Sequence, residues 1–127
     1  MSAITLEPIG RIHTPWKSLQ ECPHNVLQSE QTATIEVFPE YAAGLTALQA
    51  KQIDLLYWFD QAPRDLLESV NPHDRQRKGV FAMRSPHRPN PIALSRVPLL
   101  AIDGNTLTVG ALDCLDGTLL LDIKPAF

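Results

Sequence analysis

Long apolar runs are absent from this sequence, and cysteine is scarce. No stretch approaches the roughly 20 consecutive apolar residues of a membrane-spanning helix, and residues 1–10 lack the basic and apolar regions of a signal peptide. The two cysteines, Cys22 and Cys114, have neither CxxC nor metal-ligand spacing. We therefore expect a cytoplasmic protein with reduced thiols and no membrane association, with a disulfide between the two cysteines as the alternative.

The motifs of several large enzyme classes are also missing. The sequence has no GxGxxG loop, no Walker loop and no Gly-x-Ser-x-Gly elbow, which argues against Rossmann-type, P-loop and serine-hydrolase domains. The four histidines, His13, His24, His73 and His87, do not have the spacing of zinc ligands. The sequence therefore predicts no metal site.

The chain is long enough for one domain and is not basic overall. Its 127 residues, of which 44% are hydrophobic, predict a single domain over residues 1–127 with its own core. The net charge is −3, whereas proteins that neutralise nucleic-acid phosphates are usually basic. Nucleic-acid binding would need a local basic patch, for which the candidates are Arg75, Arg77, Lys78, Arg84 and Arg88. Charge alone does not separate this interpretation from an ordinary solvated charge run.

Short strands dominate the hydrophobic pattern. Residues 32–38 alternate, with Ala33, Ile35 and Val37 on one face, as in a half-buried strand, and the continuous apolar run 53–59 predicts a central strand. Further strands are expected at 4–13 (interrupted at Pro8-Ile9-Gly10), 79–83, 92–102 (broken or at an edge near Pro98), 106–112 and 119–123. The sequence also predicts a hairpin at Asp103-Gly104-Asn105, short helices at 39–48 and 63–70, and a polar, mobile segment at 71–78. This pattern predicts a mainly β single domain, either a barrel or a sandwich.

Residues 84–91, Arg-Ser-Pro-His-Arg-Pro-Asn-Pro, are the most unusual stretch of the chain. Three prolines lack a backbone donor and push the preceding residues toward extended geometry, so we expect a stiff loop. Apolar runs on both sides would anchor it while it presents two guanidiniums, an imidazole and an amide. The alternative is a proline-stiffened surface loop with solvated arginines.

Several motifs occur here in a characteristic order. They are Pro8-Ile9-Gly10, Thr14-Pro15-Trp16-Lys17, Gly79-Val80-Phe81-Ala82, Arg84-Ser85-Pro86, Arg88-Pro89-Asn90-Pro91-Ile92, Leu112-Asp113-Cys114-Leu115-Asp116-Gly117-Thr118 and Leu121-Asp122-Ile123-Lys124-Pro125. With these motifs the chain resembles the TsaA-like family, which includes the tRNA methyltransferase TrmO. The resemblance implies a small β-barrel with short helices that binds S-adenosylmethionine outside the Rossmann-type methyltransferase fold. It also implies a homodimer with the cofactor near the subunit interface.

The resemblance also carries over site residues, position by position. The implied cofactor-binding residues are Pro23, His24, Asn25, Asp60, Gln61, Arg84, Leu94, Asp113, Cys114, Leu115 and Asp116. Backbone groups of a turn or of Leu94 would bond the adenine edge, Asp113 or Asp116 the ribose hydroxyls or the α-amino group, and Arg84 the carboxylate. Arg88, Asn90, Arg77 and Lys78 would position RNA. No catalytic residue is assigned.

Departures from the family pattern leave three functions open. The tRNA enzymes typically carry Pro-Arg-Gln where this chain has Pro23-His24-Asn25, and His-Gln where it has Asp60-Gln61. The first hypothesis is tRNA methylation at N6 of a threonylcarbamoyl-adenosine next to the anticodon. The second is a non-catalytic S-adenosylmethionine-binding regulatory module. The third is a methyltransferase for a small molecule.

Overall fold

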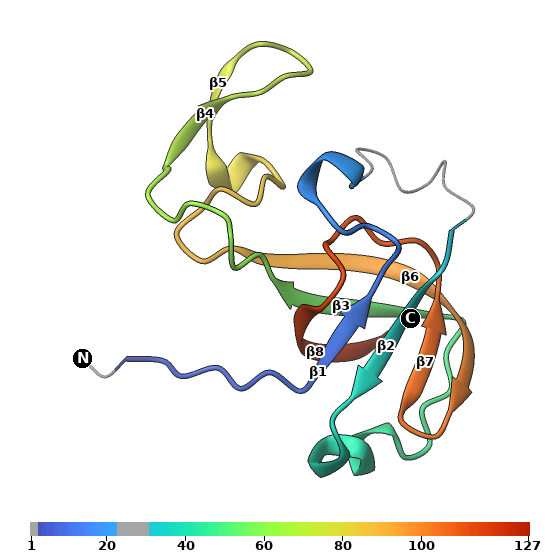
Figure 1. The fold of residues 1–127 in the computed structure, drawn as a ribbon. Helices are drawn as coiled ribbons and strands as arrows, with labels where there is room; N and C mark the ends of the chain where they lie inside the picture. Colours follow the sequence, from blue (N-terminus) through green and yellow to red (C-terminus); the bar gives the residue numbers. More distant parts are fainter. Residues whose placement is uncertain (1–2, 23–30) are drawn as a thin grey trace.

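Six strands form a closed antiparallel barrel in the computed structural model, which describes residues 3–22 and 31–127 (Figure 1). The strands follow the order β1-β2-β7-β6-β3-β8 around the barrel. Their bounds are β1 Gly10–His13, β2 Ala33–Val37, β3 Gln52–Trp58, β6 Ile92–Asp103, β7 Thr106–Val109 and β8 Thr118–Ala126. The prediction of a mainly β fold is confirmed, and of the two predicted architectures, a barrel or a sandwich, the barrel is correct. Closure pairs every strand on both sides and leaves no free edge.

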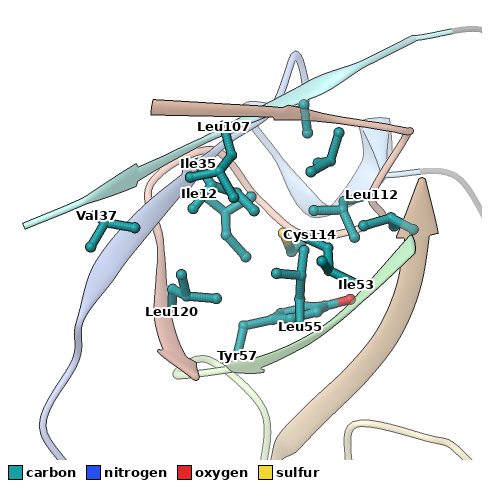
Figure 2. Packing of buried hydrophobic residues seen from close by; sticks show 13 residues of the cluster. Ile12, Ile35, Val37, Ile53, Leu55, Tyr57, Leu107, Leu112, Cys114 and Leu120 are labelled. Carbon is teal, nitrogen blue, oxygen red and sulfur yellow. The ribbon is translucent and has the colours of Figure 1, made fainter. Parts of the chain in front are cut away.

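The core fills the inside of the barrel with inward-facing side chains that come from all six strands (Figure 2). Strand β2 buries Ala33, Ile35 and Val37, as its alternation predicts. The strand expected at 53–59 is β3, which lies between β6 and β8, and every second residue of it, such as Leu55 and Tyr57, points inward. The apolar side chains between them face outward. Burial of each large aliphatic side chain contributes about 1.5–3 kcal/mol to folding.

Two glycines are required by the way the strands meet. A Cβ on Gly10 would collide with the Glu36 carbonyl oxygen of the neighbouring strand, so β1 and β2 approach this closely only with glycine. Gly104 has φ +61° in the turn between β6 and β7, a conformation that other residues rarely adopt. This turn is the hairpin that the Asp103-Gly104-Asn105 sequence predicts.

The segment between β3 and β6 differs from its prediction. No helix forms at 63–70; instead β4 Glu68–Val70 and β5 Arg77–Gly79 form a hairpin that projects from the barrel (Figure 1). Its turn, expected to be mobile, is organised by Asn71 Oδ1 accepting from the His73 amide at 2.8 Å and by Asp74 Oδ1 accepting from the Gln76 amide at 3.0 Å. Such Asx turns compete with helix formation. The strand expected at 79–83 ends at Gly79 and is followed by the 3-10 helix η4, Val80–Ala82.

The sequence predicts that the strand at 92–102 is either broken or at an edge near Pro98; β6 runs unbroken through Pro98, so the predicted break is wrong. Pro98 faces Gln52, the first residue of β3, and the Leu99 amide donates to the Lys51 carbonyl at 2.9 Å. The backbone N–H that Pro98 lacks is therefore missing only at the end of the pairing between β3 and β6.

The expected helix at 39–48 is the 3-10 helix η3, Pro39–Leu45, and a second one, η1, spans Leu19–Glu21. Within the described residues, no helix is long and apolar enough to cross a membrane.

Candidate functional site

Two adjoining pockets lie where strand β3 ends. The first, which we call the strand-end pocket, has a volume of about 260 Å³ and is lined by residues from four separate segments: Cys22, Trp58, Phe59, Asp60, Gln61, Ala62, Arg84, Pro86, His87, Asp113, Cys114, Leu115 and Thr118. The second, the outer pocket, has about 550 Å³ and shares Phe59, Arg84, Pro86 and Asp113 with the first. Small-molecule sites usually span about 300–1,000 Å³, so the two together are large enough for a nucleoside-sized ligand and a second reactant.

Arg84 lies between the two pockets with most of its hydrogen-bonding capacity unused. One guanidinium nitrogen donates to the Leu94 carbonyl oxygen of β6 at 2.6 Å, and within residues 3–22 and 31–127 no other side chain or backbone group receives a bond from it. The guanidinium has five N–H donors in a fixed fork. This arrangement orients Arg84 while leaving donors for a carboxylate or phosphate.

Arg88 has a different environment from Arg84. Its guanidinium donates to the Met83 carbonyl at 2.6 Å and to the Val80 carbonyl. These bonds connect residues 84–91, which we call the arginine–proline loop, to η4. The same loop is held from outside by Arg64, which donates to the Pro89 carbonyl at 2.8 Å and to Asn90 Oδ1 at 3.2 Å. The arginine–proline loop is thus fixed by two arginines as well as by its prolines.

A buried hydroxyl orients Asp113 at the boundary of the two pockets. The Tyr57 hydroxyl donates to Asp113 Oδ1 at 2.9 Å and also bonds Ser95 Oγ at 2.7 Å. Burial of the phenol, followed by the charge of Asp113, strongly raises the pKa of Tyr57, so the hydroxyl stays protonated and keeps its donor role. Asp113 therefore presents its second carboxylate oxygen from a fixed position.

The loop that carries Asp113 is fastened to the first loop of the chain. Thr14 Oγ1 donates to the Cys114 carbonyl at 2.8 Å, and Trp16 Nε1 donates to the Leu112 carbonyl at 2.6 Å. Asp116 joins the same contact by an ion pair of 2.6 Å with Lys17. The pKa of Asp116 is lowered, first by the bond from Lys17 and also by the Thr14 amide and the charges of Lys17 and His13. Asp116 does not line either pocket.

Most of the expected cofactor residues come together, although they lie far apart in sequence. The strand-end pocket gathers Asp60, Gln61, Arg84, Asp113, Cys114 and Leu115, and the outer pocket contains Leu94. Pro23, His24 and Asn25 lie outside the described residues. Sequence reasoning missed the aromatic pair Trp58 and Phe59, and Pro86, His87 and Thr118 as pocket walls. The position of the aromatic pair directly before Asp60 is the signal that could have identified it.

The residues expected to position RNA are more dispersed. Arg88 lines the outer pocket, whereas Asn90 lines a separate hollow beside Arg64 and Trp58. Arg77 is exposed on β5, and Lys78 forms an ion pair of 2.6 Å with Asp74.

Both cysteines are free thiols on the wall of the strand-end pocket. Burial raises the pKa of the Cys114 thiol to about 12 and also raises that of Cys22.

These features define a small antiparallel β-barrel with a pocket outside the barrel that is lined by polar and aromatic side chains. The family model of the tRNA-methyltransferase O N-terminal domain matches residues 11–127, and the chain belongs to this family. An S-adenosyl-L-methionine-binding protein of Archaeoglobus fulgidus is 42% identical over 120 residues, which cover 94% of this chain and 86% of that protein.

Longer proteins match over the same region. Another Archaeoglobus fulgidus protein is 47% identical over 126 residues, 98% of this chain but only 34% of its own length. A crystal structure of TrmO aligns with a TM-score of 0.82 at 34% identity and covers 99% of this chain and 58% of that one. TrmO from Pseudomonas aeruginosa aligns with a TM-score of 0.80 at 32% identity, over 99% of this chain and 57% of that one. The chain thus spans a little over half of the solved TrmO chains.

Proposed function

We propose that this protein binds S-adenosylmethionine in the strand-end pocket and transfers its methyl group to an adenosine of tRNA. The observation that carries the proposal is the meeting of Arg84, Asp60 and Asp113 around an aromatic-walled pocket. S-adenosylmethionine carries a carboxylate, an ammonium group and an aromatic base. A cationic side chain, acidic side chains and aromatic rings match these three groups in turn. The names of relatives, an S-adenosylmethionine-binding protein and TrmO, give independent support.

The residues present fit the chemistry of this cofactor. The unused donors of Arg84 suit the carboxylate, and the carboxylates of Asp60 and Asp113 suit the ammonium group or the ribose hydroxyls. The rings of Trp58 and Phe59 offer apolar surface for the base. When bound, the cofactor supplies an electrophilic methyl group on a positively charged sulfur.

The chain itself contributes positioning and shielding. The outer pocket adjoins the cofactor site through Arg84 and Asp113, so an acceptor held there meets the cofactor side by side. Methyl transfer requires the nucleophile in line with the breaking bond at about 3–3.5 Å and a site without water. The raised pKa of Tyr57 makes it a donor rather than a base. By its family, the acceptor we propose is N6 of a threonylcarbamoyl-adenosine next to the anticodon.

A homodimer in the cytoplasm is part of the proposal. The outer face of β6 presents an exposed apolar row, Ile92, Leu94, Leu100 and Ile102. Ile92 and Leu94 also line the outer pocket, so a second copy packed on this row would cover the site and exclude water. A stable interface buries roughly 1,200–2,000 Å² in total. Sedimentation at micromolar protein with cofactor should return the dimer mass, and a monomer would contradict this part.

A non-catalytic S-adenosylmethionine-binding module is the second candidate. The relative from Archaeoglobus fulgidus, of which this chain covers 86%, is named for binding alone, and the net charge of −3 does not favour RNA. A small-molecule methyltransferase is the third candidate, because the outer pocket has the size of a small-ligand site.

Two experiments separate these functions. Calorimetric titration with S-adenosylmethionine in the presence of a chelator should show binding, and the absence of both heat and a thermal shift would exclude all three candidates. Mass spectrometry of tRNA nucleosides from a deletion strain should then show the loss of one methylated adenosine. Recovery of that nucleoside by the wild-type gene is the control. An unchanged nucleoside profile despite cofactor binding would favour the second or third function.

A further inference from the structure

Phe81 is a large aromatic side chain held outside the core by a rigid support. Its side chain is 85% exposed, whereas the adjacent Val80 is fully buried and anchors η4 to the protein. Arg88 fixes the same turn through the Val80 and Met83 carbonyls. Exposed apolar residues are common on protein surfaces, so exposure alone says little. Here, however, the backbone on both sides of Phe81 is held in place, by the burial of Val80 and by the bonds from Arg88.

The segment that carries Phe81 is basic in a protein that is otherwise acidic. Residues 64–88 contain six Lys and Arg against three Asp and Glu, whereas the rest of the chain has five against eleven. Arg75 and Arg77 on the projecting hairpin are exposed and, among the described residues, have no side-chain partner. Figure 1 shows η4 directly at the base of this hairpin. Proteins hold unpaired nucleotides by combining an exposed aromatic ring with unpaired cations on the same surface segment.

We infer that Phe81 is a stacking platform for an unpaired base of the RNA substrate, with Arg75 and Arg77 contacting the adjacent phosphates. The inference rests on the proposed function and adds a residue that the cofactor site does not include. Arg77 lies four residues before Phe81, at most about 14 Å along extended backbone, which is the span of a few nucleotides. A base that stacks on Phe81 would be held three residues from Arg84, which borders both pockets.

The basic surroundings favour RNA over a protein partner for this surface. A self-contact of two copies through residues 64–88 would bring like charges together, which is unfavourable. The apolar side chains of β6, in contrast, lie on both sides of Arg96, whose charge is paired with Asp54, and they suit a second copy. The two surfaces therefore have separate partners.

The test uses the full chain and an RNA hairpin with the anticodon loop of a tRNA. Phe81→Ala should weaken RNA binding roughly 5- to 100-fold, the usual effect of losing one stacked base, with cofactor affinity and thermal stability unchanged. Phe81→Leu should lose as much RNA affinity, because leucine keeps the apolar area but not the aromatic ring. Phe81→Trp should bind like wild type, and RNA should quench its added fluorescence. Phe127→Ala, which removes another fully exposed phenylalanine, is the matched control and should have no effect.

The outcomes distinguish this inference from the proposed function. If wild type methylates tRNA and Phe81→Ala does so with unchanged RNA affinity, the stacking role is overturned and the proposed function stands. If Phe81→Ala converts a dimer into a monomer in sedimentation, Phe81 is a protein contact and the inference is wrong. If wild type neither binds nor methylates the RNA, the proposed function fails first and the stacking role fails with it.

Discussion

The guanidinium of Arg84 and the carbonyl oxygen of Leu94 are joined by a hydrogen bond of 2.6 Å. The bond connects the arginine–proline loop to strand β6 at the boundary of the two pockets. It fixes the direction of the arginine without using all of its donors. Two residues that the family resemblance assigns to one cofactor therefore also support each other.

Arg84→Ala should weaken S-adenosylmethionine binding by about 1.5–3 kcal/mol, the usual contribution of a hydrogen bond to a charged group. Because Arg84 is exposed before the ligand binds, we expect the lower half of this range. Calorimetric titration measures the effect. Arg75→Ala, at the hairpin turn, is the control and should bind the cofactor normally. Equal losses in the two variants would mean that Arg84 acts only through overall charge.

Asp113→Asn and Asp116→Asn should have different effects on cofactor binding. Asp113 lines both pockets, whereas Asp116 pairs with Lys17 and lines neither. We expect a loss of cofactor affinity for Asp113→Asn only. Asp116→Asn should instead cost less than about 1 kcal/mol of stability, because the pair is partly exposed. That stability is present above the ordinary carboxyl pKa and is lost as pH falls through the lowered pKa of Asp116. Equal loss of cofactor affinity in both variants would restore the original assignment of Asp116.

Arg88→Ala should lower the free energy of unfolding by about 2 kcal/mol, because the Val80 and Met83 carbonyls lose their donor. Chemical denaturation measures this loss. Arg77→Ala, with an exposed arginine on β5, is the control and should unfold like wild type. The sequence predicts instead that Arg88 contacts RNA directly. Normal stability together with weaker, less salt-dependent RNA binding would favour that role.

Tyr57→Phe should change how stability depends on pH. Below pH 10, the ordinary phenol value, Tyr57 is protonated in both states. Above it, the unfolded chain releases the proton while the buried phenol keeps it, so wild-type stability falls as pH rises. The variant should lose about 1–3 kcal/mol at neutral pH, from the bonds to Ser95 and Asp113, but fall less above pH 10. Tyr41→Phe, at a half-buried tyrosine bonded to Glu7, should retain most of the wild-type alkaline loss. Parallel stability curves for wild type and Tyr57→Phe would contradict the shifted pKa.

Cys22 should be alkylated in the native protein and protected by S-adenosylmethionine. It lines the strand-end pocket and is half-buried, whereas Cys114 is buried with its pKa raised to about 12 by that burial. Mass spectrometry after iodoacetamide treatment should find one label per native chain, fewer with cofactor, and none in Cys22→Ser. Unchanged labelling at saturating cofactor would place the ligand elsewhere. Absence of free thiols in unreduced, denatured protein would instead support the disulfide alternative.

The fold class could be predicted from the sequence because local patterns decide it. The alternation in β2, the Asp103-Gly104-Asn105 turn and the prolines of the arginine–proline loop each restrict their own segment. The secondary-structure predictions that were wrong lie at 63–83, where the side chains of Asn71 and Asp74 accept hydrogen bonds from backbone amides and organise a hairpin. The unbroken course of β6 through Pro98 likewise depends on where β3 begins. Neither outcome is visible in local hydrophobic periodicity.

For the candidate site, the sequence by itself determined which kinds of side chains are available and in which motifs they occur. Only the tertiary structure decided their neighbours. Barrel closure brings Asp60, Arg84 and Asp113 to one pocket, while the Lys17 ion pair holds Asp116 away from it. Arg84 and Arg88 look equivalent in the sequence, yet one keeps free donors and the other bonds its own loop. The physical reason is that hydrogen-bond partners distant in sequence become neighbours only when the strands pair.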